Sequence, residues 1–150
     1  MSKNGTYLEY YFLNSDAFKA IRSAHTLRVL IEFYRRRRIH KYSDHKGGRT
    51  QTVITNNGEI EFRYDDAIKR LKLSQTTFSR ALDELVKLGF IDVTEMSCGL
   101  HRQATKYAIS ERYLKYGTPD FKEIDRDRIT PPFAKNKKNQ LPYMNKKRGQ

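Results

Sequence analysis

The segment LKLSQTTFSRALDELVKLGFI, residues 71–91, constrains the fold more strongly than any other part of this chain. Ser74 stands where a helix N-cap is favoured, and Gly89 stands where a glycine commonly ends a helix. Between them, apolar residues recur at the spacing of one helix face, which predicts a helix over residues 75–88. The residues on that face are Phe78, Ala81, Leu82, Leu85 and Leu88.

The flanking sequence predicts a characteristic order of elements. A shorter helix is expected over residues 64–71, and strands are expected over residues 90–95 and 105–110, with a polar tip between the strands. Helix, tight turn, helix, strand, strand is the order of a helix-turn-helix (about residues 64–88) followed by a β-hairpin wing (about residues 90–110). The predicted fold class is therefore α+β, mainly helical, of the winged helix-turn-helix type.

Residues 71–91 also resemble the recognition segment of winged helix-turn-helix DNA-binding proteins, in which S-x-x-T-[VF]-S-R-x-L-x-x-L-x-x-x-G-[FL]-I recurs. The wider layout, with NNGEIEF before this segment and ERYLKYGTPDF after the wing, resembles small prophage or mobile-element regulators or replication proteins. The resemblance implies that the opening turns of the second helix contact DNA and that the hairpin tip contacts the minor groove or the backbone. The residues that inherit the DNA-contacting role are Ser74, Gln75, Thr76, Thr77, Ser79 and Arg80.

The sequence departs from that family at Lys72, in a turn position usually held by glycine. Glycine adopts the left-handed backbone conformation readily, whereas another residue there costs roughly 1 kcal/mol. Either Lys72 adopts that conformation, or the turn is slightly longer than usual. In both cases its ammonium group is a candidate phosphate contact.

The charge of the chain favours a polyanionic partner, because 30 Lys and Arg face 17 Asp and Glu, a net charge of +13. Seven cations and one acid lie in residues 35–49, and six cations and no acid lie in residues 134–150, whereas the helix over residues 75–88 is neutral. Phosphate contacts position a protein on DNA, and base contacts specify the sequence. These clusters are therefore expected to add affinity for DNA more than to recognise particular bases. The candidate phosphate contacts outside the recognition segment are Arg35, Arg36, Arg37 and Arg38, with Arg102 and Lys106 on the wing.

The remaining elements are predicted more weakly. Residues 6–13 read as a strand or extended segment, a short helix follows Asn14 and Ser15, and a longer helix covers about residues 23–37. Residues 40–57 read as a polar loop, within which residues 50–55 alternate weakly and predict a weak strand. Asn57-Gly58 favours a hairpin that joins this strand to a second one at about residues 59–62.

One domain is expected over residues 1–121, ending in a short helix at ERYLKY. From residue 122 the chain has no apolar period, and residues 122–150 are predicted to form a disordered basic tail.

Several classes of protein are not expected. The chain shows neither a secretory signal nor an apolar run long enough to span a bilayer, so a cytoplasmic, nucleoid-associated protein without membrane contact is expected. Neither Cys98 with His101 nor His40 with its neighbours supplies the four ligands of a structural zinc site. We expect no metal, no cofactor and no enzymatic activity.

The leading functional prediction is sequence-specific binding of double-stranded DNA by a bacterial or phage transcriptional regulator. Two alternatives stay open, namely a plasmid or prophage replication initiator and a winged helix module that binds protein or RNA. A homodimer also stays open, because many such regulators bind DNA as twofold dimers.

Overall fold

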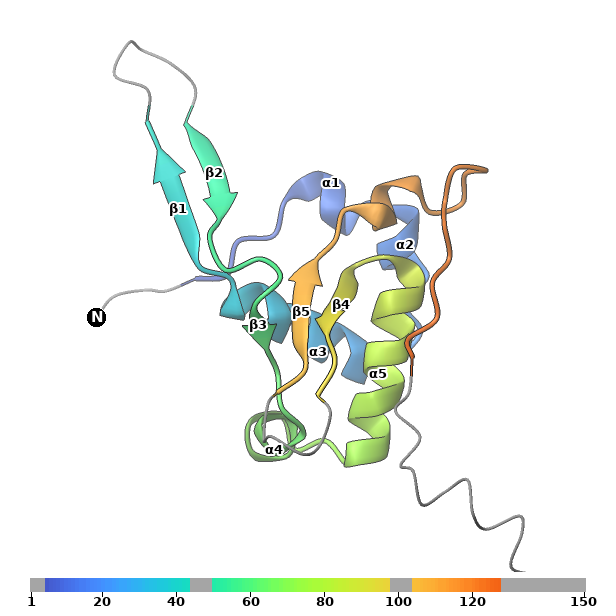
Figure 1. Cartoon of the computed structure of the whole chain (residues 1–150). Coiled ribbons are helices and arrows are strands. Elements are labelled where there is room, and N and C mark those ends of the chain that lie inside the picture. The colour runs from blue at the N-terminus through green and yellow to red at the C-terminus, as the bar shows by residue number, and fades with distance from the viewer. Residues whose placement is uncertain (1–4, 44–49, 98–103, 128–150) are drawn as a thin grey trace, which may run out of the picture.

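The computed structural model describes residues 5–43, 50–97 and 104–127, and these form an α+β fold with two small antiparallel sheets. Figure 1 shows one sheet inside the body, flanked by helices, and the other extending from it as a two-stranded ribbon. The hydrophobic core lies between α3 (Ala24–Arg36), α5 (Gln75–Leu88) and the inner sheet. Its largest fully buried side chains include Tyr107, Phe33, Phe78 and Phe90.

The second half of the N-terminal segment is helical where the sequence predicted a strand or extended segment. Residues 6–13 were expected to be extended, but α1 covers Tyr10–Leu13. The reason is packing: Phe12 is buried in a cluster of aromatic rings, while Tyr10 and Tyr11 face solvent, so residues 10–12 do not alternate between two faces. The rings that contact Phe12 are those of Phe18, Tyr34, Phe90 and Tyr113.

The next two helices begin where the sequence predicted. The hydroxyl of Ser15 accepts a hydrogen bond from the backbone N–H of Phe18 and caps α2 (Asp16–Lys19). Ser23 caps α3 in the same way by accepting from the N–H of His25. These caps satisfy amides that have no partner inside a helix.

The stretch predicted to be a polar loop contains a β-ribbon instead. β1 (Ile39–Tyr42) pairs antiparallel with β2 (Gln51–Ile54). The weak strand predicted near the end of this stretch is β2, whereas β1 was missed. Neither face of the ribbon is buried, so the residues of β1 do not show the alternation of apolar and polar side chains from which strands are predicted.

The hairpin predicted at Asn57-Gly58 is also wrong. A turn does form there, with Gly58 at a φ of 88°, but β3 (Ile60–Glu61) pairs with β5 (Lys106–Ile109) and not with β2. The side chain of Asn57 explains the difference, because its Oδ1 accepts from the N–H of Ile109 at 2.7 Å and its Nδ2 donates to the same residue's carbonyl at 3.2 Å. These two bonds tie the turn to the end of β5.

The two helices around the predicted turn are present. A short α4 (Tyr64–Asp66) continues into a π-helical segment, η1 (Ala67–Leu71), and then the chain turns at Lys72. Lys72 adopts the left-handed conformation, with a φ of 55°, as the first of the two predicted possibilities required. Ser74 caps α5 by accepting from the N–H of Thr77, and Gly89 ends that helix at a φ of 86°.

The strands that follow α5 are confirmed as well. β4 (Ile91–Glu95) pairs antiparallel with β5, and the strand order of the inner sheet is β3-β5-β4. The 3₁₀ helix η2 (Arg112–Lys115) follows β5, where the sequence predicted a short helix. Arg102, at the tip between β4 and β5, lies outside the described residues.

The described chain continues past the expected domain boundary. Residues 122–127, the start of the predicted tail, run beside α5 (Figure 1). Lys122 accepts a hydrogen bond from Arg112 through its carbonyl, Glu123 pairs with Lys87, and Arg126 contacts Ser79. Residues 128–150 lie outside the described part of the chain.

Candidate nucleic-acid interface

The N-terminal half of α5 presents three polar side chains to solvent. Gln75, Thr76 and Arg80 are exposed, and within the described residues none of these side chains has a hydrogen-bond or ion-pair partner. Thr76 and Arg80 are four positions apart, so they lie on the same side of the helix. These three side chains are therefore available to a ligand that approaches the end of α5.

Two other predicted contacts hold the helix together. Ser74 accepts from the N–H of Thr77 at 3.2 Å, and the two hydroxyl groups lie 2.9 Å apart. Ser74 and Thr77 thus complete the N-cap of α5.

Arg126 covers the remaining predicted base contact, Ser79. Its Nη2 donates to the Ser79 hydroxyl at 2.6 Å, and its Nε donates to Asp83 Oδ1 at 2.7 Å. Arg126 also lies close enough to the hydroxyl groups of Tyr64 and Tyr107 to interact with them, so it links α5 to α4 and to β5. Its side chain is 10% exposed, and Ser79 is consequently shielded on this side.

The contacts of Arg126 with Ser79 and Asp83 were not predicted from the sequence, because a contact between two residues far apart in the chain leaves no periodic pattern.

Tyr107, which lies near Arg126, is buried in the core. Its ring packs against Phe33 of α3, and burial raises the pKa of Tyr107 to about 12, although the nearby Arg126 opposes the rise. A tyrosine hydroxyl is protonated at neutral pH, so it can donate or accept a hydrogen bond at this position.

Two further cations lie next to the free end of α5. Lys69 and Lys72 are exposed, and among the described residues neither ammonium group has a partner. The left-handed turn at Lys72 is supported from α3, because Arg28 donates to the carbonyl of Leu71 at 2.8 Å. With Arg80, these lysines place positive charge around a helix N-terminus, which itself attracts anions.

The predicted wing contact Lys106 is paired within the sheet. Its Nζ lies 2.8 Å from Glu95 Oε2, and the hydrogen bond and charge of Glu95 hold the pKa of Lys106 above its ordinary value. A phosphate would have to compete with Glu95 for this ammonium group.

The four consecutive arginines do not form one surface. Arg36 lies over the ring of Phe62 and bonds to Glu32, Asp66 and the carbonyl of Glu61. Arg37 stacks on the ring of Tyr34. Both are therefore part of the fold, and the predicted group of four phosphate contacts is reduced to the outer two.

Those outer two differ from each other. Arg35 is exposed but reaches back to Glu32 at 3.3 Å. Arg38 is exposed, and its side chain has no partner among the described residues. Its backbone is nevertheless held, because its N–H donates to Asn56 Oδ1 at 2.8 Å.

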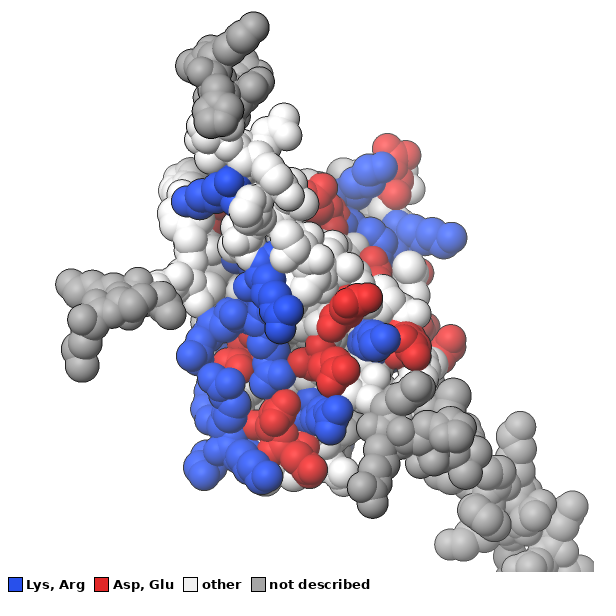
Figure 2. Space-filling view, turned by 60° about the vertical axis from the view of Figure 1, so that its left-hand side comes forward, with Lys and Arg blue, Asp and Glu red and all other residues white. Residues whose placement is uncertain are grey.

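Glu32 forms ion pairs with three arginines. Its carboxylate is 2% exposed and lies within 3.4 Å of guanidinium groups from Arg35, Arg36 and Arg70. This cluster joins α3 to η1. Figure 2 shows Lys and Arg gathered along one side of the molecule with Asp and Glu among them, so the surface charge there is mixed.

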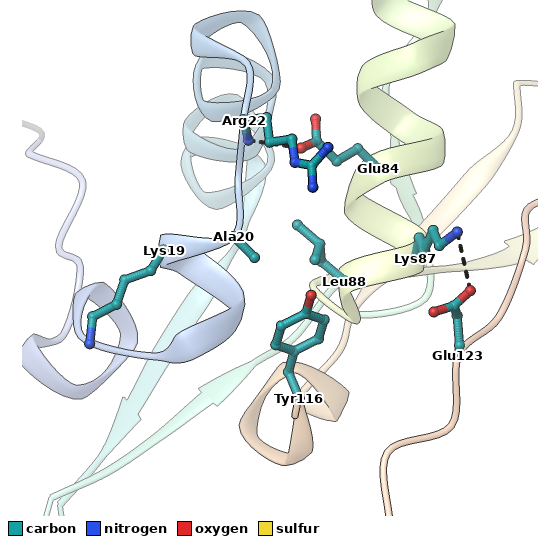
Figure 3. Close-up of a pocket in the computed structure, with 8 residues that line it drawn as sticks. All are labelled: Lys19, Ala20, Arg22, Glu84, Lys87, Leu88, Tyr116 and Glu123. Atoms are coloured by element: carbon teal, nitrogen blue, oxygen red, sulfur yellow. Dashed lines mark hydrogen bonds and ion pairs between the residues drawn. The ribbon is translucent and has the colours of Figure 1, made fainter. Parts of the chain in front are cut away.

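A pocket of about 480 Å³ opens between α2, the C-terminal end of α5 and η2 (Figure 3). Its charged lining is largely engaged: Glu84 accepts from the N–H of Arg22 at 3.0 Å, and Lys87 pairs with Glu123 at 3.2 Å. The pocket thus lies where three segments of the chain are tied together, at the end of α5 away from Gln75.

The described part of the chain contains neither a cluster of potential metal ligands nor a membrane-spanning helix. Within residues 5–43, 50–97 and 104–127, no group of three or more His, Cys, Asp and Glu is arranged to hold a metal ion. No helix in those ranges has the length and apolar character needed to cross a bilayer.

Comparison with known proteins adds no relative. Neither the protein-family models nor the curated proteins nor the solved structures contain a match to this chain.

Proposed function

We infer that this protein binds double-stranded DNA sequence-specifically, in the manner of a winged helix-turn-helix protein and without catalysing a reaction. One observation carries the proposal: Gln75, Thr76 and Arg80 are exposed and unpartnered, among the described residues, at the N-terminal end of a helix whose apolar face is buried in the core. Polar side chains in that position are free to form hydrogen bonds with a ligand. α4 and the outer ends of β4 and β5 reach the same end of the molecule (Figure 1).

The chemistry of these side chains suits base edges. Arginine pairs bidentately with O6 and N7 of guanine, and glutamine pairs with N6 and N7 of adenine. The major groove is wide enough for an α-helix, and its donor and acceptor pattern distinguishes all four base pairs. In this proposal Arg80 and Gln75 read bases, and Lys69 and Lys72 contact phosphates.

The contacts of Arg126 refine the proposal. Ser79 and Asp83 are engaged by Arg126, so base reading is assigned to Thr76 and Arg80 on the neighbouring side of α5 and to Gln75 at its first turn. Transcriptional regulation is the role that we propose for this binding. Selection of bound duplexes from a random pool tests sequence-specific duplex binding, since a protein that reads bases enriches one defined site.

Arg80→Ala is expected to weaken binding to the selected duplex by about 1–3 kcal/mol and to relax the preference at one base pair. The physical reason is the loss of a bidentate contact with a base. Fluorescence anisotropy with the selected site and with single-base variants of it measures both effects. Lys115→Ala is the matched control, because Lys115 is also exposed but lies on η2. Equal losses in the two variants would contradict a reading role for Arg80.

Removal of residues 128–150 is expected to weaken binding to all duplexes alike, on the order of tenfold, because this segment carries seven cations and no acid. The slope of log affinity against log salt should become shallower by about 0.9 for each phosphate that these cations neutralise in the full chain. The truncated chain keeps Arg126 and its contacts with Asp83 and Ser79 of α5. A change in sequence preference without a change in salt slope would overturn this division of roles.

A further inference from the structure

The β1–β2 ribbon is the part of the described fold that the duplex proposal does not use. It projects from the body on the side away from the N-terminus of α5 (Figure 1). Every residue of its strands except Ile54 is exposed. An isolated two-stranded ribbon is marginally stable in water, so an exposed ribbon of this kind is a candidate for contact with a partner.

The strand register gives this ribbon two different faces. Side chains alternate along a strand, so Arg38, His40 and Tyr42 lie on one face. Val53 stands opposite His40 on that face. Because a strand advances about 3.4 Å per residue, the side chains of His40 and Tyr42 lie about 7 Å apart along β1. Arg38 directly precedes β1, and its carbonyl accepts from the N–H of Thr55 at 2.8 Å, so the backbone pairing continues to this residue.

The aromatic groups of this face are open to solvent. Tyr42 is 54% exposed, and its ring centre lies 4.4 Å from that of His40 in an edge-on arrangement. Val53 beside them is 45% exposed. The rings therefore present apolar surface that nothing in the described part of the chain covers.

The charge of the ribbon selects the kind of partner. Residues 38–43 and 50–57 contain Arg38 and Lys41 and no acid, and neither cationic side chain has a partner among the described residues. Glu59 and Glu61 meet Arg38 at the base of the ribbon, where they line a pocket with it. A second copy of the chain would bring another Arg38 and Lys41 against this face, and these like charges oppose self-association.

We propose that the face of Arg38, His40 and Tyr42 binds single-stranded DNA, with Tyr42 and His40 stacking on unpaired bases and Arg38 contacting phosphate. In a duplex the faces of the bases are stacked on one another, whereas in a single strand they are free to stack on aromatic side chains. Lys41, on the other face of the ribbon, contacts the same backbone from its edge. The choice of DNA over RNA rests on the proposed duplex function.

The test uses the full chain and a fluorescent oligothymidylate of about 16 nucleotides, a length that fills a typical single-strand site. Tyr42→Ala should weaken its binding by about fivefold to a hundredfold, because stacking on an aromatic side chain contributes that much per base. Tyr42→Phe keeps the ring and should bind within about twofold of the unaltered chain. Tyr10→Ala, which removes an exposed tyrosine from α1, is the matched control.

Three results would overturn the proposal. Tyr42→Ala and Tyr10→Ala could bind oligothymidylate equally well, or an oligouridylate could bind more tightly than oligothymidylate. Sedimentation could instead show a dimer that Tyr42→Ala dissociates, which would make the ribbon a contact between two copies. Failure of the duplex proposal is distinguishable, because Arg80→Ala should alter duplex binding and leave oligothymidylate binding unchanged.

Discussion

Gly89→Ala is expected to lower the free energy of unfolding by about 2–5 kcal/mol. Gly89 ends α5 at a φ of 86°, a left-handed conformation that costs a residue with a Cβ about 1–2 kcal/mol. A Cβ at this position would also lie 2.8 Å from the backbone N of Tyr113 and 2.9 Å from Arg112. Urea denaturation followed by circular dichroism measures the loss.

The clash at Gly89 involves backbone that is fixed in place. The carbonyl of Gly89 accepts from the N–H of Tyr113 at 3.0 Å, so η2 packs directly on the end of α5. Gly117→Ala separates the two contributions, because Gly117 has a φ of 80° but an added Cβ there would meet no atom within 4 Å. It should cost only about 1 kcal/mol. Equal losses for the two variants would show that the contact with η2 contributes nothing.

The sequence predicts α5 closely because the signals that start and end this helix are local. The Ser74 hydroxyl reaches an amide three residues away, and Gly89 adopts a conformation that few other residues tolerate. The left-handed conformation of Lys72 was one of two possibilities that the family resemblance left open, and the structure selects it. Elements whose signals lie within a few residues are the ones that could be predicted.

The elements that were missed depend on contacts between distant segments. The turn at Asn57 does not lead β2 into β3 because its side chain bonds to Ile109, which is 52 residues away. Arg126 reaches Asp83, which is 43 residues away. The spacing of residues along the chain predicts neither the contact of Asn57 with Ile109 nor that of Arg126 with Asp83.

The candidate site was predicted in part for the same reason. Gln75, Thr76 and Arg80 are free of partners among the described residues, as the amphipathic pattern of α5 indicated. The engagement of Arg36 carried a signal that was not used, because it lies four residues after Glu32 and such pairs meet on one side of a helix. The burial of Glu32 depends on the packing of distant segments around it, so it could not be predicted from the sequence.

Glu32→Gln is expected to destabilise the fold by about 2–4 kcal/mol. Glutamine keeps the shape of the side chain but removes the charge that faces the guanidinium groups of Arg35, Arg36 and Arg70. Removing one partner of a buried ion pair is costly because the other charge loses its compensation. The expected loss of stability lies below the roughly 3–5 kcal/mol typical of breaking a fully buried ion pair, because all three arginines are partly exposed to water and stay hydrated. Urea denaturation at neutral pH measures it.

Glu61→Gln is the control that isolates burial as the cause. Glu61 also pairs with an arginine, Arg63, at 3.3 Å, but both side chains of that pair are exposed. Exposed pairs contribute about 0–1 kcal/mol, so this variant should be nearly as stable as the unaltered chain. Because Arg70 belongs to η1, loss of the Glu32 cluster should also loosen the segment that leads to Lys72 and α5. Similar losses for the two variants would mean that burial of Glu32 adds nothing, and that α3 and η1 are held together by their apolar contacts.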